Sequence, residues 1–225
     1  MSAEADFAVR RARMVERQLR RRGIEDERVL SAMNEVPRDR FVPKRLREHA
    51  YDDSALPIGD DQTISQPWVV AAICQALALS GSERVLEIGT GSGYSAAVLS
   101  RLAREVISLE RITRLGEAAR ATLGGLGIDR VEVEIGDGSQ GWPHRAPYEA
   151  IAVHAATPEA PYTLIGQLAS SGRLVVPIAA GSVDMLTLFR REDGGLRQQT
   201  IGPCRFVPLI GVEGFSDAPP PPGTD

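Results

Sequence analysis

The chain of 225 residues has few of the side chains that bind metals or form disulfides, with only two cysteines and three histidines. Cys74 and Cys204 both lie in apolar runs, which predicts buried free thiols in a reducing compartment. His49, His144 and His154 show no metal-ligand spacing with either cysteine. The sequence therefore predicts no metal site and no disulfide-rich fold.

The chain also lacks an excess of positive charge and a long hydrophobic run. It has 26 Lys and Arg against 30 Asp and Glu, whereas a general binder of nucleic acid or anionic membranes needs a basic surface. No run approaches the ~20 apolar residues of a membrane-spanning helix. The N-terminal residues MSAEADFAVRRARMVERQ contain no apolar signal-peptide core. We expect a cytoplasmic, monomeric protein whose partners are neither nucleic acid nor membrane.

Strand-like and helical patterns alternate through the second half of the chain. This alternation predicts an α/β fold with a doubly wound, mostly parallel sheet. Two last strands around a turn at 193–195 predict an antiparallel end to that sheet. The predicted strands are 84–89, 105–110, 130–137, 149–156, 172–179, 184–192 and 203–211, with helices near 94–103, 111–123 and 160–170.

The first half of the chain has a different character and predicts extra helices before the sheet. Helical patterns cover residues 5–22, a short segment that ends before Pro37, and residues 67–79 with Pro67 in the first turn. We therefore divide the chain into three parts. These are an N-terminal helical segment (1–80) that includes a loop at 56–67, an α/β core (81–212), and a proline-rich tail (213–225) predicted to be disordered.

A glycine loop follows the first strand of the core, in VLEIGTGSGYSAA (85–97). Gly89, Gly91 and Gly93 allow the backbone to approach a ligand closely at the start of a helix. The string GSGYSA also satisfies the dinucleotide fingerprint G-x-G-x-x-G/A. The glycines alone leave two cofactors open, a nicotinamide dinucleotide and S-adenosylmethionine.

Acidic residues near strand ends separate these two cofactors. Glu87, two residues before the first glycine, would repel a pyrophosphate but attract the ammonium and sulfonium of S-adenosylmethionine. Glu110 is predicted to accept hydrogen bonds from the ribose hydroxyls, and Asp137 with Gly138 to hold the amino group of adenine. Trp142 is either a wall for the adenine or a core residue. Together the acids favour S-adenosylmethionine.

Several motifs, in this order, resemble the protein-L-isoaspartate (D-aspartate) O-methyltransferase family from about Met14 to Gly211. They include VPRDRFVP, LPIGDDQTISQP, VLEIGTGSGYSAAVLS, GDGSQGWP, GRLVVPI and RFVPL, of which LPIGDDQTISQP is the most diagnostic. The resemblance implies a Rossmann-like, S-adenosylmethionine-dependent methyltransferase fold. It also implies methylation of the α-carboxylate of L-isoaspartyl residues in damaged proteins and peptides, with S-adenosylhomocysteine as by-product. Acceptance of D-aspartyl sites stays open.

The same resemblance assigns roles to the segment that precedes the third predicted helix. It implies that Gln62, Thr63 and Ile64 lie over the methyl donor and that Ser65 orients the substrate carboxylate. Because a carboxylate is already ionised at pH 7, it needs alignment rather than a general base, and a hydroxyl suits that task. Without the resemblance, Ser65 is better explained as an N-cap of the helix at 67–79.

The resemblance further implies that Val207, Pro208 and Leu209 line the substrate site. Two residues depart from the family pattern near that site. His154 stands where the family usually has threonine, and Trp68 where it usually has tyrosine or histidine. These departures leave substrate preference open.

Three other functions remain open on sequence grounds. One is an O-methyltransferase that acts on aspartates of a single dedicated partner peptide. A nicotinamide-dependent oxidoreductase is disfavoured by Glu87 and by the lack of a recognisable acid or base for hydride transfer. A non-catalytic binding module is disfavoured because the glycine loop, Glu110, Asp137 and Ser65 are all present.

Overall fold

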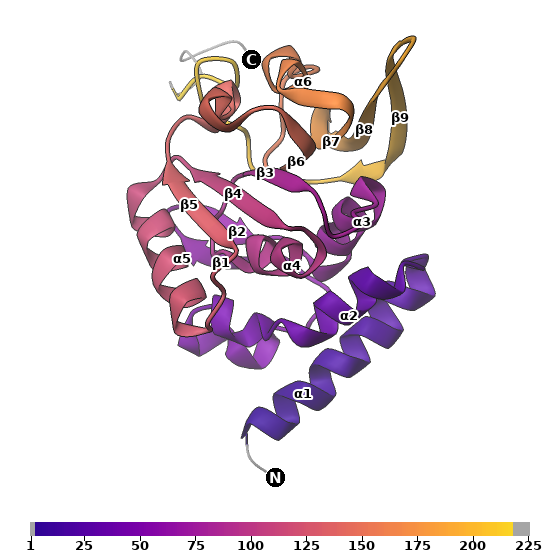
Figure 1. Ribbon diagram of the computed structural model, residues 1–225. Coiled ribbons are helices and arrows are strands. Elements are labelled where there is room, and N and C mark those ends of the chain that lie inside the picture. The colour runs from indigo at the N-terminus through magenta and orange to yellow at the C-terminus, as the bar shows by residue number, and fades with distance from the viewer. Residues whose placement is uncertain (1–2, 218–225) are drawn as a thin grey trace.

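The computed structural model describes residues 3–217, and its centre is a seven-stranded sheet with helices on both faces (Figure 1). The strand order is β5-β4-β3-β6-β7-β8-β9. Neighbours from β5 to β7 pair in parallel, whereas β8 is antiparallel to both of its neighbours. The predicted mostly parallel sheet with an antiparallel end is confirmed. The strands are β3 (Arg84–Ile88), β4 (Glu105–Glu110), β5 (Val131–Ile135), β6 (Tyr148–Val153), β7 (Leu168–Ala180), β8 (Val183–Glu192) and β9 (Gly195–Cys204).

Three α-helices precede the sheet, as predicted, and the first of them lies on the side of the molecule away from the C-terminal part of the described chain (Figure 1). The first, α1 (Ala3–Met14), continues through a π-helical turn (Val15–Leu19). The second, α2 (Glu27–Glu35), begins where the Asp26 carboxylate accepts from two backbone N–H groups. The later helices are α3 (Pro67–Leu77), α4 (Tyr94–Leu102), α5 (Thr113–Gly125) and α6 (Tyr162–Gly166).

The core has two layers, one on each face of the sheet. Along β3, Val85 belongs to the layer that contains the N-terminal helices, α3 and α4, while Leu86 and Ile88 belong to the layer that contains α6. Because both faces of β3 are covered, the successive residues Val85 and Leu86, and then Ile88, are apolar and buried, with the buried acid Glu87 between them. Because the first layer is shared, the segment 1–80 and the α/β core fold around common apolar contacts.

The segment LPIGDDQTI forms a β-hairpin that the sequence analysis treated only as a loop. Strands β1 (Leu56–Gly59) and β2 (Gln62–Ile64) pair antiparallel, and Asp60 and Asp61 turn between them at positive φ. Aspartate tolerates that left-handed conformation better than most residues, which accounts for the adjacent pair. The salt bridge Asp60–Arg114 (2.6 Å) ties the tip of the hairpin to α5.

Three predicted boundaries are wrong. The last strand is 195–204 rather than 203–211, because β9 lies at the sheet edge with mostly exposed side chains and so has no apolar alternation. The helix predicted at 160–170 spans only Tyr162–Gly166, since β7 already begins at Leu168. The tail was predicted to be disordered from residue 213, yet residues 213–217 fold back on the core. There the backbone N–H of Glu213 donates to Ser139 Oγ (3.0 Å). Residues 218–225 lie outside the described part.

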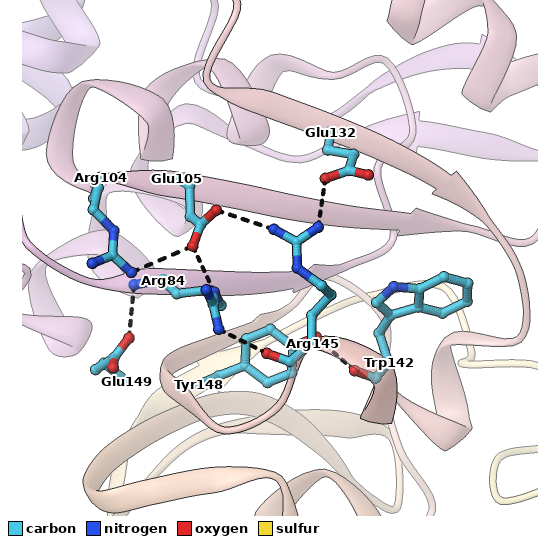
Figure 2. A network of polar contacts seen from close by, with 8 residues as sticks. All are labelled: Arg84, Arg104, Glu105, Glu132, Trp142, Arg145, Tyr148 and Glu149. Atoms are coloured by element: carbon cyan, nitrogen blue, oxygen red, sulfur yellow. Dashed lines mark hydrogen bonds and ion pairs between the residues drawn. The ribbon is translucent and has the colours of Figure 1, made fainter.

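The amino ends of the parallel strands carry a network of ion pairs (Figure 2). Glu105, at the start of β4, accepts from Arg84, Arg104 and Arg145, and Arg145 also bonds Glu132 (3.0 Å). The side chains of Glu105 and Arg145 are 29% and 38% exposed. At this edge, carboxylates and guanidinium groups meet as partners.

Within residues 3–217, no helix has the length and apolar character needed to cross a membrane. Nor does that part of the chain hold a group of three or more His, Cys, Asp or Glu placed to bind a metal ion. Both cysteines are free thiols, Cys74 buried and Cys204 partly exposed.

Candidate functional site

A cleft that is open to solvent at its mouth lies at the carboxyl ends of the parallel strands. This is the usual ligand position in an open α/β sheet. The chain turns in opposite directions from β3 and from β6, so the cleft lies at the switch point between them. Its walls come from the β1–β2 hairpin, the glycine loop, the ends of β4 and β6, and the segment 207–210.

Most of the predicted site residues line this cleft. They are Gln62, Thr63, Ile64, Ser65, Gly89, Gly91, Glu110, Gly138, Val207, Pro208 and Leu209. Segments that are up to 147 positions apart in the sequence, from Gln62 to Leu209, therefore meet around one cavity. The other three predicted residues, Glu87, Gly93 and Asp137, lie just behind its wall.

The glycine loop needs its glycines for conformation and for space. Gly89, Gly91 and Gly93 have φ values of 89°, 54° and 87°, a region that favours glycine. A Cβ on Gly91 would stand 3.3 Å from Ile58 of the hairpin, and one on Gly93 would stand 3.2 Å from Ala119. Gly93 thus permits packing against α5, and Gly91 permits the hairpin to close over the loop.

Glu110 ends β4 and faces the cleft with its carboxylate already positioned. The backbone N–H of Gly91 donates to Oε2 (2.8 Å) and that of Ile112 donates to Oε1 (3.0 Å). Each oxygen can accept more than one hydrogen bond, so both retain capacity for a ligand. A rigid carboxylate with free lone pairs suits the two vicinal hydroxyls of a ribose.

Ser65 follows β2, lines the cleft and is partly exposed. The N-cap of α3 is Gln66, and no side-chain hydrogen bond caps the helix. The alternative prediction that Ser65 caps this helix is therefore wrong. Pro67 at the first position has no N–H to be capped, which reduces the need for a cap. The Ser65 hydroxyl is left available to a ligand.

The segment Val207–Leu209 is held in an extended path beside β6. The N–H of Ala156 donates to Val207 O (2.8 Å), and the N–H of Leu209 donates to Ala156 O (2.7 Å). These bonds fix the backbone while the three residues line the cleft. An extended backbone of this kind offers its other edge to a peptide.

Glu87 lies behind the cleft wall and is completely buried. The hydroxyls of Ser95 and Ser108 donate to its two oxygens. Burial raises the pKa of Glu87 to about 7, against the lowering effect of these two hydrogen bonds, and the charge of Glu110 adds to the rise. The predicted direct attraction between Glu87 and a ligand cation is thus corrected, since His154 stands between the carboxylate and the cleft at 3.4 Å from Oε1.

Asp137 also differs from its predicted role. Its Oδ1 accepts from the N–H and hydroxyl of Ser139 (2.9 and 2.7 Å), and its Oδ2 accepts from the N–H of Val212 (2.8 Å). Burial alone would raise its pKa, but these hydrogen bonds outweigh burial and hold the pKa below the usual value. In this conformation Asp137 anchors the folded-back segment, while Gly138 beside it lines the cleft.

Both tryptophans that the sequence placed near the site face elsewhere. The Trp68 ring donates to Arg22 O (3.2 Å) and lies under the Arg22 guanidinium, so it packs on the N-terminal segment. Trp142 packs against the apolar layer that contains α6. Of the two alternatives left open for Trp142, an adenine wall or a core residue, the packing supports the core residue.

Several lining residues were missed by the sequence analysis. Arg111 and Ile112 directly follow the predicted ribose ligand, a position that could have signalled them. Tyr94 and Ile210 carried no such signal, since both occur in ordinary apolar runs. The missed residues are Val70, Ile88, Thr90, Ser92, Tyr94, Ser95, Leu109, Arg111, Ile112, Ala155 and Ile210.

The cleft fits the cofactor S-adenosylmethionine. The glycine backbone permits close approach, and Glu110 is oriented for two hydroxyls and gives the cleft a carboxylate that favours a cationic ligand. The one arginine that lines the cleft, Arg111, is paired with Asp217 (3.1 Å). A pyrophosphate would find no free cation among these lining residues.

Comparisons with known proteins agree with this assignment. The family model for protein-L-isoaspartate(D-aspartate) O-methyltransferase matches residues 10–214. The chain is 52% identical to protein-L-isoaspartate O-methyltransferase 1 of Rhodopseudomonas palustris (strain HaA2), over 97% of this chain and 90% of that protein. It is 49% identical to the corresponding enzyme of Methanoculleus marisnigri, over 94% and 97%.

Solved structures show the same relationship. A protein-L-isoaspartate O-methyltransferase structure superposes with a TM-score of 0.80 at 32% identity and covers 91% of this chain and 67% of that one. A Plasmodium falciparum structure described as a putative member, in complex with S-adenosyl-L-homocysteine, shares the fold with a TM-score of 0.77 at 24% identity, over 89% and 98%. The chain therefore belongs to the protein-L-isoaspartate (D-aspartate) O-methyltransferase family.

Proposed function

We propose that this protein transfers a methyl group from S-adenosylmethionine to the α-carboxylate of L-isoaspartyl residues in damaged proteins and peptides. The observation that carries the proposal is the convergence of the glycine loop, Glu110 and Ser65 on one cleft in a chain of this family. The resulting ester can close to a succinimide, and hydrolysis then returns part of the residue to normal aspartate. The activity would thus begin a repair process.

The residues of the cleft suit a displacement that requires no proton transfer. S-adenosylmethionine supplies an electrophilic methyl on a sulfonium, so that attack by a carboxylate oxygen breaks the S–C bond and leaves S-adenosylhomocysteine. Glu110 and the glycine loop would fix the position of the donor. Since the attacking carboxylate is ionised at neutral pH, the chain needs to supply alignment and exclusion of water rather than a base.

Ser65 would orient the substrate. Its hydroxyl lies in the cleft without a capping role and can donate to one carboxylate oxygen, which leaves the other free to attack. Val207, Pro208 and Leu209 would hold the substrate backbone on the other side. Recognition of a carboxylate and a backbone, rather than of particular side chains, fits a broad range of damaged substrates.

A matched pair of peptides tests this function. The peptides differ only in one Asp or isoAsp linkage and are incubated with S-adenosylmethionine labelled in the methyl group. We expect base-labile label on the isoAsp peptide alone. Label on neither peptide would contradict the repair function and favour a dedicated partner peptide as substrate. A third peptide with D-Asp at the same position decides whether D-aspartyl sites are accepted.

We further propose that the protein works as a monomer in the cytoplasm. Two free thiols, Cys74 and Cys204, suit a reducing compartment. Segments of this one chain supply the glycine loop, Glu110 and Ser65 of the cleft. Sedimentation at micromolar concentration should give a mass close to 24.3 kDa, and a dimer mass would overturn the monomer proposal.

A further inference from the structure

His154 is a buried polar residue at the centre of the site that lacks hydrogen-bond partners. It follows β6 directly, lines the cleft, and packs beside Gly89 of the glycine loop and 6.5 Å from the ring of Phe206. Its side chain is only 6% exposed. Neither ring nitrogen has a hydrogen-bond partner within the described chain. Such an unpaired buried group is costly, and a ligand can satisfy it.

The only charged group against the imidazole in the described chain is the Glu87 carboxylate, 3.4 Å from Nε2. That separation is close enough for attraction, but the two groups are not aligned as a hydrogen bond. Burial lowers the pKa of His154 to about 4, so the ring is neutral at pH 7 and does not neutralise Glu87. The other groups that face Glu87 are the hydroxyls of Ser95 on α4 and Ser108 on β4, the acid Glu110 and the thiol of Cys74 on α3. None of them supplies a cation.

We propose that His154 positions the methyl donor. Its imidazole accepts a hydrogen bond from the ammonium of the donor's amino-acid part, and His154 thereby connects that ammonium to the buried Glu87 carboxylate. This inference rests on the proposed function, because it assumes that S-adenosylmethionine binds in the cleft. Glu87 itself is too deeply buried to reach the ligand.

The protonation of the ring follows from its neighbour. A neutral imidazole carries one N–H, and which nitrogen holds it is decided by the strongest nearby acceptor. Glu87 Oε1 lies 3.4 Å from Nε2. A bound ammonium favours the ionised form of Glu87, and that carboxylate favours the imidazole proton on Nε2, which leaves Nδ1 as an acceptor. A nitrogen that accepts hydrogen bonds can bind the ammonium of the donor, whereas it repels the carboxylate of the substrate. Because both nitrogens lack partners, a small rotation of the ring toward the cleft breaks no existing hydrogen bond.

Binding measurements with two ligands test the proposal. S-adenosylhomocysteine carries the amino-acid part, whereas 5′-methylthioadenosine has the same adenosine and thioether but no ammonium. His154→Phe keeps a ring and removes both nitrogens. We expect it to weaken S-adenosylhomocysteine binding by about tenfold, the loss of one hydrogen bond to a charged group, and to change 5′-methylthioadenosine binding less than twofold. Calorimetry gives both dissociation constants.

The other outcomes are equally informative. Equal loss for both ligands would show that His154 only shapes the cleft, and unchanged binding of S-adenosylhomocysteine would show that it does not contact the ammonium; either result overturns the proposal. Failure of the unsubstituted protein to bind S-adenosylhomocysteine would instead contradict the proposed function. His154→Leu, which also lacks nitrogens, replaces the Phe variant if that variant does not fold. His154→Asn, which keeps an acceptor, should recover part of the affinity.

A proton measurement gives a second, independent test. An ammonium bound near Glu87 favours its ionised form, so S-adenosylhomocysteine should release protons on binding at pH 7. Calorimetry in buffers with different ionisation enthalpies measures this release. Glu87→Gln should abolish it, and 5′-methylthioadenosine should cause none. Equal proton release by both ligands would contradict the assignment.

Discussion

The acidic residues at the two ends of the parallel strands have opposite surroundings. At the amino ends, Glu105 is surrounded by three arginines that are partly exposed to solvent (Figure 2). At the carboxyl ends, Glu87 is completely buried, and its described neighbours are hydroxyls, a thiol, a neutral histidine and the acid Glu110, none of which supplies a cation. The neighbouring arginines lower the pKa of Glu105, chiefly through the Arg84 hydrogen bond, while burial raises the pKa of Glu87 to about 7.

This difference separates structure from function on a single sheet. Paired surface charges contribute modestly to stability, and because they already have partners they offer no free charge to a ligand. A buried acid without a cationic partner and a buried histidine without a hydrogen-bond partner both lower the stability of the fold. Such groups remain only where a function offsets that loss of stability. The carboxyl ends are therefore the part of the sheet whose energetics improve when a cationic ligand binds.

The largest expected effect comes from the cleft itself. Ser65→Ala removes the hydroxyl that we assign to the substrate carboxylate, and kcat should fall by roughly 10²–10³-fold, as for loss of one oriented donor in other active sites. The dissociation constant of S-adenosylhomocysteine should change less than about threefold. Steady-state kinetics with the isoAsp peptide and calorimetry check the two values. Equal losses in both would mark Ser65 as structural.

The next largest effect is the pH dependence of folding stability, which should differ between Glu87 and Glu105. In the unfolded chain Glu87 ionises near pH 4.5, but in the folded protein it keeps its proton up to about pH 7. Folding stability is therefore lost as pH rises through this window, by up to about 3 kcal/mol at 1.36 kcal/mol per pKa unit. Glu87→Gln cannot ionise, so its stability relative to the unsubstituted protein should increase between pH 5 and pH 8.

Urea unfolding at several pH values checks this prediction. The unfolding free energies of both proteins are compared at each pH, so that the titration of His154, present in both, largely cancels. A difference between the two proteins that does not change with pH would contradict the assignment of the raised pKa to Glu87. Glu105→Gln at the other end of the sheet is the matched control. It keeps Glu87, so its stability should fall with rising pH as in the unsubstituted protein, and the difference between those two proteins should stay constant from pH 5 to pH 8.

The smallest effect is expected at the amino ends. Arg145→Ala removes two partly exposed ion pairs, with Glu105 and Glu132, and should lower the unfolding free energy by less than about 1 kcal/mol. Half-molar salt should reduce that difference, since it screens exposed charges. The affinity for S-adenosylhomocysteine should stay unchanged. A large loss of ligand affinity would contradict the proposal that the amino ends serve stability and the carboxyl ends serve ligand binding.

Much of the fold could be predicted because burial leaves a pattern in the sequence. β3, β4 and β6 are buried because both faces of the sheet are covered, so each carries adjacent apolar residues such as Val85 and Leu86. The glycine loop follows from the turn that β3 must make. β9 was misplaced for the opposite reason, because an exposed edge strand such as GLRQQTIGPC needs no apolar alternation. The hairpin at 56–64 was missed because its strands have only four and three residues.

The site could be predicted as a set of residues but not as an arrangement. Ser65, Glu110 and Val207 come from distant segments, and only the sheet order brings their side chains to one cleft. The direct contact predicted for Glu87 was wrong because the sequence does not tell which of two polar neighbours lies nearer the cavity. Asp137 was assigned to a ligand, yet its Oδ2 accepts a hydrogen bond from the N–H of Val212, which lies 75 residues further along the chain.

The sequence by itself determined the composition of the core, the alternation of strands and helices, the glycine loop and the family to which the chain belongs. These properties depend on local patterns of apolar, glycine and acidic residues. The tertiary structure alone decided that His154 stands between Glu87 and the cleft, that Ser65 is not a helix cap, and that residues 213–217 fold back on Ser139 and Arg111. Burial and pKa depend on what the rest of the chain places around each group, and no local pattern carries that information.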